Sequence, residues 1–346
     1  MDDIRNIVIF FFSGTGNAKQ IALWFSEFAI NKGIECQIFD ISKTDTNAIA
    51  PLSSDTLIVF ISPVHGFNFP KITLNFIEHF PKGKNRVVLM NTRAGMKIGR
   101  IVTPGLTGIA FFLSSIILRR KGYKIVGQIP FDMPSNWISI HPALNENTIK
   151  YLHEKNYSRV EKHAKKLFLG QSDFLSNRDI IQDILISPVS LGYYLVGRFA
   201  FAKSFYASNA CDNCNLCIKQ CPVKAIKTDN NHPYWTFKCE SCMKCMNSCP
   251  KKAIETAHGL FIIVIVLSST ILAFLINDIL RISIQVDIIR EIISTLLFFA
   301  LLWIFYKLQH LLLRSSFIGK LISFTSLTHY KFWGRYKSIP DNKWKK

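Results

Sequence analysis

The sequence predicts an α/β protein with three parts: a doubly wound parallel sheet, a small cysteine-rich domain and a pair of membrane-spanning helices. Three observations lead to this fold class. Apolar runs alternate with amphipathic segments over the first half of the chain. Eight of the nine cysteines lie between Cys211 and Cys249, and the stretch 259–277 carries no charge. A chain of 346 residues is long enough for two or three domains.

Five apolar runs in the first half predict strands. They are "NIVIFFF" (6–12), "ECQIFDI" (35–41), "DTLIVFISPV" (55–64), "RVVLMNT" (86–92) and "YKIVGQIPF" (123–131). The segments that begin at Asn17, Lys71 and Gly105 predict helices between them. Nearly continuous apolar strands joined by helices indicate a parallel sheet covered on both faces. Five such strands suit a flavodoxin-like doubly wound sheet, in which ligands bind at the carboxyl ends of the strands.

Two further segments complete this first domain, which we expect to span residues 1–170. The apolar segment 105–118 is only 14 residues long and lies between two expected strands. It is therefore better interpreted as a buried crossover helix than as a membrane segment. The charged amphipathic segment 146–170 predicts a closing helix. Residues 171–205 are expected to form a partly helical connector that packs between domains or lies against a membrane.

A loop of small residues follows the first strand and opens the next helix. It consists of Ser13, Gly14, Thr15, Gly16 and Asn17. Backbone N–H groups at a helix N-terminus favour an anion, most often a phosphate. A Walker A loop would need Gly-Lys-Ser/Thr, and a dinucleotide loop would need a third glycine where this chain has Lys19. Asp40 keeps an NAD interpretation open, but one phosphate of a flavin mononucleotide (FMN) fits the loop better.

The cysteines form two copies of C-x2-C-x2-C-x3-C-P, "CDNCNLCIKQCP" and "CESCMKCMNSCP". This spacing is the bacterial ferredoxin pattern, in which the fourth cysteine of each copy binds the other cluster. One 4Fe–4S cluster is therefore expected on Cys211, Cys214, Cys217 and Cys249. The other is expected on Cys239, Cys242, Cys245 and Cys221.

The duplication continues past the cysteines as "PVKAI" and "PKKAI", so the repeat covers about 28 residues. A pair of structural zinc sites would need four ligands each and no repeated x3-C-P, which makes zinc the weaker interpretation. We expect this dicluster domain to span residues 206–257. Clustered metal-binding cysteines, with no leader before the first strand, indicate a reducing cytoplasm.

With both motifs in view, the chain resembles the flavodoxin–ferredoxin fusion proteins of anaerobic bacteria and archaea. The matching stretches are "FFSGTGNAKQIA", "SPVHGFNFP", "NTRAG", "MPSNWI" and "KSFYASNACDNC". The resemblance covers about residues 4–256 and implies FMN, with its phosphate on the loop 13–17. The flavin ring would lie between two loops, formed by Pro63, Val64, His65, Gly66 and Phe67 and by Asn91, Thr92, Arg93, Ala94 and Gly95.

Both ring loops follow expected strands, which places them at the same edge of the sheet as the phosphate loop. Phe67 or Phe69 would cover a flavin face or, alternatively, pack in the core. Arg93 would place positive charge near a reduced flavin or would be a solvated surface residue. Many relatives carry tyrosine where this chain has His65.

The C-terminal quarter predicts a membrane hairpin over residues 258–313. Residues 259–277 are long enough to span a bilayer, and residues 292–306 form a shorter second span or an interfacial helix. From Lys307 to Lys346 there are nine Lys and Arg against the single acid Asp341. The positive-inside rule then places both ends of the hairpin in the cytoplasm, with a basic tail over 314–346. Tyr330, Trp333 and Tyr336 would suit a lipid interface.

The formal net charge of +19 does not indicate nucleic-acid binding, because it is dispersed and no nucleic-acid motif is present. The sequence predicts a membrane-anchored electron-transfer flavoprotein that passes electrons between two 4Fe–4S clusters and FMN. A redox protein or a quinone would be its partner. A reductase acting on a quinone or another small molecule is the alternative, and a non-redox membrane scaffold is a third class. No catalytic side chain stands out.

Overall fold

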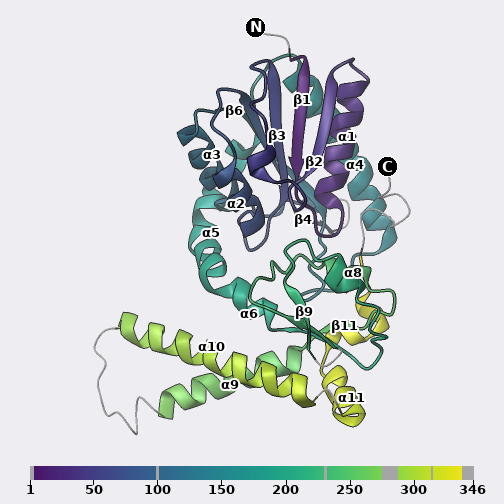
Figure 1. The fold of residues 1–346 in the computed structure, drawn as a ribbon, viewed down its shortest axis with the longest axis vertical. Helices are drawn as coiled ribbons and strands as arrows, with labels where there is room; N and C mark the ends of the chain where they lie inside the picture. The colour runs from purple at the N-terminus through teal and green to yellow at the C-terminus, as the bar shows by residue number, and fades with distance from the viewer. Residues whose placement is uncertain (1–3, 99–100, 230–231, 275–286, 313–314, 337–346) are drawn as a thin grey trace.

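The computed structural model describes residues 4–98, 101–229, 232–274, 287–312 and 315–336. Figure 1 shows the three parts in sequence: a sheet covered by helices, a smaller irregular domain beside the ends of the strands, and a long helix pair below it. The carboxyl ends of the strands point towards the smaller domain (Figure 1). The sheet edge where ligands bind in this topology therefore faces the cysteine-rich domain.

The main sheet has the strand order β2-β1-β3-β4-β6-β7, and all neighbours on this path are parallel. Its strands are β1 (Asn6–Phe11), β2 (Glu35–Asp40), β3 (Thr56–Pro63), β4 (Arg86–Ile98), β6 (Lys124–Pro134) and β7 (Asp173–Phe174). A short β5 (Ile101–Thr103) pairs antiparallel with β4. The first five strands on the path follow the flavodoxin-like order of a doubly wound sheet. The strand β7 extends the sheet beyond the five expected strands.

Helices cover both faces of the sheet, and alternation along β1 explains why. Ile7, Ile9 and Phe11 point into the core beneath α1 (Asn17–Ile30) and α4 (Glu146–Phe168). Val8 and Phe10 point into the opposite core beneath α2 (Lys71–His79) and α3 (Ala110–Arg120). Burial on both sides is the reason that this strand reads as one apolar run. The apolar segment 105–118 supplies most of α3, which is a crossover helix.

The connector packs between the domains in its second half. It contains the 3-10 turn Leu175–Asp179, α5 (Ile180–Gly192), a π-helical turn (Tyr193–Gly197) and α6 (Arg198–Ala202). The ring of Tyr193 lies against Gly66, and the ring of Phe201 lies 5.0 Å from that of Trp137. In α5, by contrast, Ile181 and Leu185 are about three-quarters exposed, at 76% and 75%.

The cysteine-rich domain repeats its backbone as well as its sequence. Its elements are β8 (Phe205–Ala207) paired with β11 (Ile254–Thr256), β9 (Ile226–Asp229) paired with β10 (His232–Trp235), α7 (Leu216–Lys219) and α8 (Lys244–Ser248). Six non-glycine residues with positive φ fall at equivalent places in the two copies: Asn213 and Ser241, Asn215 and Met243, Lys224 and Lys252. Non-glycine residues rarely adopt this conformation, so its recurrence indicates a shared constraint, the wrapping of the chain around a ligand.

The membrane hairpin requires correction. Helix α9 (His258–Phe274) packs on α10 (Asp287–Leu312) through the fully buried Val264 and Leu302. Within the described residues, only one helix is long and apolar enough to cross a membrane, over Glu291–Leu312. The expectation of two spans is therefore not supported within the described residues, where α9 covers 17 residues. Residues 275–277 of the expected first span and the loop to 286 lie outside the described residues.

The tail after α10 does not follow the expected pattern either. It forms α11 (Ser316–Phe324) and two 3-10 turns, Leu327–His329 and Lys331–Trp333. Trp333 and Tyr336 were expected at a lipid interface, but they are 7% and 2% exposed and lie between the sheet domain and the cysteine-rich domain. An aromatic side chain with a polar tip suits a protein interface as well as a membrane, and here protein covers it. Residues 337–346 of the expected basic tail lie outside the described residues.

Candidate functional site

The phosphate-type loop leaves the N-terminus of α1 open to an anion. Gly16 has φ 109° and provides no side-chain cap, so the first N–H groups of α1 lack the usual partner. The Gly16 N–H donates instead to Ser13 Oγ at 3.1 Å, which fixes the turn. Thr15 Oγ1 accepts a hydrogen bond from Asn136 Nδ2. A helix N-terminus with a glycine approach is a standard anion site.

A cleft of about 540 Å³, open solvent included, lies over this loop at the carboxyl edge of the sheet. The lining residues come from four loops or strand ends and from the cysteine-rich domain: Ser13, Gly14, Thr15, Asn17, Ala18, Pro63, Val64, His65, Thr92, Arg93, Ala94, Pro134, Ser135, Asn136, Trp137 and Ser241.

Ten of the fifteen residues expected to bind FMN line this cleft, and five do not: Gly16, Gly66, Phe67, Asn91 and Gly95. Residues 91–95 were expected to form a loop after a strand, but they continue β4 and pair with β6 as far as Pro134. They reach the cleft as a strand edge.

The two phenylalanines proposed to cover the flavin lie elsewhere. Phe69 is 1% exposed and packs in the sheet core, with its ring 6.1 Å from that of Phe111. Phe67 is outside the cleft and has φ 65°, and its carbonyl accepts hydrogen bonds from Ile109 N at 3.0 Å and Ser190 Oγ at 2.7 Å. Its backbone therefore ties the loop to α3 and α5.

Arg93 is neither solvated nor a free positive charge. Its Nε donates to Asp132 Oδ1 at 2.7 Å and its Nη1 to Asp179 Oδ2 at 2.6 Å, and its side chain is 4% exposed. These ion pairs join β4 to β6 and to the connector. Two carboxylates balance the guanidinium charge, so Arg93 contributes less positive potential to the cleft than the sequence suggested.

Three buried side-chain polar atoms in the cleft wall have no partner among the described residues. They are Nδ1 of His65, Nε1 of Trp137 and Oγ of Ser241. Burial lowers the pKa of His65 to about 4, so the imidazole is neutral near pH 7. Buried polar groups are nearly always satisfied, so these atoms fit a polar ring system bound in the cleft.

The site includes a segment that our sequence-based assignment missed, Pro134 to Trp137. It begins at the last residue of β6, so the rule that ligands bind at strand carboxyl ends would have identified it. Ala18, in the first turn of α1, was also missed. The last missed residue, Ser241, lies far along the chain, between two cysteines. No local sequence signal links it to the sheet.

The thiols gather into the two sets expected from the exchanged pattern. Burial, together with the negative charge of Cys211 and Cys249, raises the pKa of Cys217 to about 11. Burial, with Cys221 as a negative neighbour, raises the pKa of Cys242 to about 12. The fourth cysteine of each motif therefore lies near the first three of the other copy. We call the set of Cys239, Cys242, Cys245 and Cys221 the proximal set and the other the distal set.

Backbone N–H groups point at the cysteine sulfurs. Ala225 N donates to Cys221 Sγ at 3.2 Å, and Ala253 N donates to Cys249 Sγ at 3.3 Å. Within the described residues, no three His, Cys, Asp or Glu side chains lie close enough to hold a single metal ion. Each thiolate of a 4Fe–4S cube binds a different iron, so such ligands stand farther apart than those around one zinc. The donor set fits two cubes.

The proximal set lies directly against the phosphate loop. A Cβ on Gly14 would overlap the carbonyl oxygen of Cys242 and lie 2.9 Å from its Cβ. Only glycine permits this approach. The neighbouring Ser241 forms part of the cleft wall. The same short loop thus supplies Cys242, an expected cluster ligand, and one wall of the cleft.

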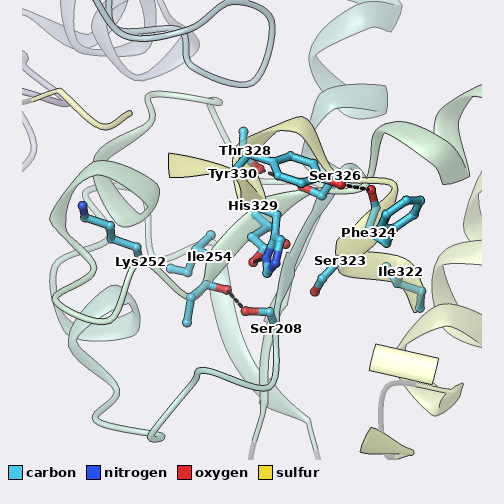
Figure 2. Close-up of polar contacts among 12 residues, drawn as sticks. Ser208, Lys252, Ile254, Ile322, Ser323, Phe324, Ser326, Thr328, His329 and Tyr330 are labelled. Atoms are coloured by element: carbon cyan, nitrogen blue, oxygen red, sulfur yellow. Dashed lines mark hydrogen bonds and ion pairs between the residues drawn. The ribbon is translucent and has the colours of Figure 1, made fainter. Parts of the chain in front are cut away.

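The C-terminal tail contacts both the dicluster domain and the sheet domain. Figure 2 shows His329 of the tail beside Ile254 of the dicluster domain. Thr328 Oγ1 accepts from Thr256 N at 2.8 Å, and His329 Nδ1 lies 2.9 Å from Glu255 Oε1.

Further along the tail, two aromatic side chains reach the sheet domain. Trp333 Nε1 donates to the Ile138 carbonyl at 2.5 Å. The hydroxyl of Tyr336 donates to Asn17 Oδ1, in the phosphate loop, at 2.7 Å. The tail therefore reaches the candidate flavin site.

Comparison with protein families identifies residues 210–254 as a 4Fe–4S dicluster domain. This segment contains all eight clustered cysteines. A comparison with curated proteins finds no match.

Several solved structures resemble the sheet domain. Oxidised flavodoxin 1 from Bacillus cereus is 13% identical, with a TM-score of 0.31, over 46% of this chain and 98% of that one. A Fusobacterium nucleatum flavodoxin mutant bound to flavin mononucleotide is 17% identical, with a TM-score of 0.31, over 49% and 99%. Rubredoxin oxygen:oxidoreductase from the anaerobe Desulfovibrio gigas is 11% identical, with a TM-score of 0.31, over 49% of this chain and only 38% of its own.

Because these TM-scores are low, the similarity to these structures does not by itself establish the fold. The flavodoxin-like assignment depends on the strand order of the sheet. The chain therefore combines a flavodoxin-like sheet with a 4Fe–4S dicluster domain. Two such clusters are one-electron carriers, and the protein is accordingly an electron-transfer protein.

Proposed function

We propose that this protein transfers electrons between its two 4Fe–4S clusters and an FMN bound in the cleft, through the proximal set. The contact between Gly14 and Cys242 carries the proposal, because it joins the expected phosphate site to a cluster ligand. FMN, when bound, exchanges either one or two electrons, whereas each cluster exchanges one. The combination would convert between one- and two-electron chemistry.

The side chains of the cleft would hold FMN in two ways. The N-terminus of α1, with Ser13 and Thr15, would bind the phosphate. His65 and Trp137 would offer their unpartnered ring nitrogens to the polar edge of the flavin. A single anion site without a second glycine-rich turn favours a mononucleotide over FAD or NAD.

The distal set would serve as the entry point for electrons. Cys214 is exposed, whereas Cys242 and Cys245 lie deeper, against the sheet domain and its loops. A redox protein that docks near Cys214 would reach the distal cluster first, and the proximal cluster would follow on the way to the cleft. We propose a protein partner at this surface, and a quinone at the cleft as the alternative acceptor.

Cofactor analysis tests this function. Anaerobically prepared full-length protein is expected to contain about eight iron and about eight sulfide per chain, because each 4Fe–4S cluster supplies four of each. Denaturation is expected to release one FMN and no adenine nucleotide. Recovery of FAD or NAD, or of stoichiometric zinc with little iron, would contradict the proposal.

We also propose that α10 attaches the protein to a membrane. Its apolar side chains are exposed along the helix, including Leu296 at 66%, Trp303 at 48% and Ile304 at 50%. The helix is long enough to cross a bilayer. Its C-terminal end is instead anchored in the dicluster domain, where Tyr306 is fully buried and its hydroxyl donates to the Phe205 carbonyl at 3.1 Å. The clusters would therefore lie at the membrane surface.

Placing aspartate on the exposed face of α10 is expected to release the protein from membranes. The double variant Leu296→Asp/Ile304→Asp would add about 2.5–3.5 kcal/mol for each acid at the centre of a spanning helix. Cell fractionation measures the result, and iron content checks that the dicluster domain remains intact. The matched Leu296→Ala/Ile304→Ala variant should stay in the membrane fraction. Unchanged distribution of the aspartate variant would rule out membrane attachment by this helix.

A further inference from the structure

A buried lysine lies beside the proximal set. Lys203 follows α6 and is 1% exposed. Its Nζ donates to the Trp235 carbonyl at 2.6 Å and to the Tyr234 hydroxyl at 3.3 Å. Lysine is almost never fully buried without a partner, so its position here requires an explanation.

Three aromatic rings enclose the ammonium group. Its Nζ lies 4.2 Å from the ring centroid of Phe237, 4.6 Å from that of Tyr306 and 4.7 Å from that of Tyr234. The rings come from β10, from the loop before Cys239 and from α10. Each cation–π contact favours the charged form of the lysine, by an amount that grows when the site is desolvated. The cage is therefore built for a cation.

No Asp or Glu among the described residues forms an ion pair with Lys203. Trp235, whose carbonyl accepts from Lys203 Nζ, packs in the same core cluster as Cys239 and Cys245 of the proximal set, which places the lysine beside this set. Burial and the neighbouring Lys307 lower the pKa of Lys203 to about 8, and Cys239 opposes this shift. A buried cation without a carboxylate needs a counter-charge, and a cluster held by four thiolates is an anion.

The two halves of the repeat differ at this point. Phe237, two residues before Cys239, corresponds to Asn209, two residues before Cys211. Beside the distal set, Lys251 is exposed and lies 4.0 Å from the carboxylate of Asp212. The aromatic residue Phe237 of the cage therefore has no aromatic counterpart in the other half of the repeat.

We propose that Lys203 is the electrostatic partner of the proximal cluster and raises its reduction potential relative to that of the distal cluster. Reduction adds one negative charge to the cluster, so a fixed cation nearby stabilises the reduced form more than the oxidised form. Electrons would consequently favour the cluster beside the cleft. The inference rests on the proposed function only in taking the proximal cysteines as cluster ligands.

Redox titration of the full-length, cluster-loaded protein, followed by electron paramagnetic resonance, tests the proposal. In Lys203→Met the potential of one cluster is expected to fall while the other stays constant. The affected signal should be the one that disappears in Cys242→Ser. Lys203→Arg, which keeps the charge, should retain the parental value. The exposed Lys227→Met is the matched control for loss of a charge elsewhere in the domain.

Unchanged potentials in Lys203→Met with full iron content would overturn the proposal. If Lys203→Met loses iron, the potentials and iron content are measured in Lys203→Gln, because its amide can still donate to the Trp235 carbonyl without carrying charge. Loss of the proximal cluster in both neutral variants but not in Lys203→Arg would support a role for the charge. Loss in all three would show that the lysine acts through packing. None of these measurements depends on flavin reduction. Their outcome is therefore independent of whether electrons pass from the clusters to FMN.

Discussion

Replacing Cys242 with serine is expected to slow the reduction of FMN by a low-potential donor by at least about tenfold, equivalent to about 1.4 kcal/mol in activation free energy. Cys242 belongs to the proximal set, and its backbone lies against Gly14 of the phosphate loop. Loss of this ligand damages the cluster nearest the cleft and leaves the flavin side chains in place. Anaerobic stopped-flow measurement of flavin absorbance gives the rate.

The matched variant is Cys214→Ser, which damages the distal cluster at the exposed end of the domain. With a small diffusible reductant, this variant should reduce its flavin faster than Cys242→Ser, because the proximal cluster remains available. With a protein donor that docks at the distal surface, both variants should be slow. Parental rates in Cys242→Ser, with FMN still bound, would mean that the proximal cluster is not on the route.

The parts of this site that sequence predicts well are those whose chemistry is local. Three cysteines two residues apart can reach one cube because of their spacing alone, and the following proline ends the turn. The loop from Ser13 to Asn17 is recognisable because one strand and one helix suffice to build an anion site. Similarly, β1 reads as buried on both faces because its own residues are apolar throughout.

What sequence does not predict is the contact between distant segments. Ser241 reaches the cleft only because the dicluster domain docks on the sheet edge, and no periodicity encodes that docking. The sequence around Arg93 does not reveal whether its side chain is solvated or paired. Only the fold brings Asp132 and Asp179 to it. Phe69 lies beside an expected binding loop in the sequence, but the fold buries its ring in the core.

The C-terminal quarter shows how one pattern fits two environments. Apolar helices, aromatic residues and lysines characterise a membrane interface, and they equally characterise a strap across a protein surface. Tyr306 ends an apolar segment expected to lie in lipid, yet it is buried in the dicluster domain beside Lys203. Trp333 similarly packs with Ile138 of the sheet domain and Met246 of the dicluster domain. The amino-acid pattern indicates that these side chains avoid water. It does not distinguish lipid from protein as the material that covers them.

The tail ends, within the described residues, on a tyrosine that contacts the candidate flavin site. The backbone N–H of Tyr336 donates to Asn247 Oδ1 at 2.6 Å, which holds the residue on the dicluster domain. Its hydroxyl donates to Asn17 Oδ1, and Nδ2 of Asn17 donates to the Pro134 carbonyl at 2.8 Å. Asn17 is thereby fixed from both sides at the first turn of α1, where the phosphate of FMN would bind.

Removing this hydroxyl is expected to weaken FMN binding. In Tyr336→Phe the buried Asn17 oxygen loses its donor, at a cost of about 1–2 kcal/mol, equivalent to about a 5- to 30-fold increase in the Kd for FMN. Titration of flavin-free protein with FMN, followed by quenching of flavin fluorescence, measures the change. Iron content should remain parental, because the backbone bond to Asn247 does not involve the hydroxyl.

Tyr330→Phe is the control for this experiment. It makes the same chemical change in the same tail, but the hydroxyl of Tyr330 donates to the Phe324 carbonyl and lies away from the phosphate loop. Its Kd for FMN should equal that of the parent. If Tyr336→Phe also binds FMN with the parental Kd, the tail fastens the two domains without ordering the phosphate loop. If only Tyr336→Phe is weakened, the segment that follows the apolar helices orders the candidate flavin site directly through the bond to Asn17.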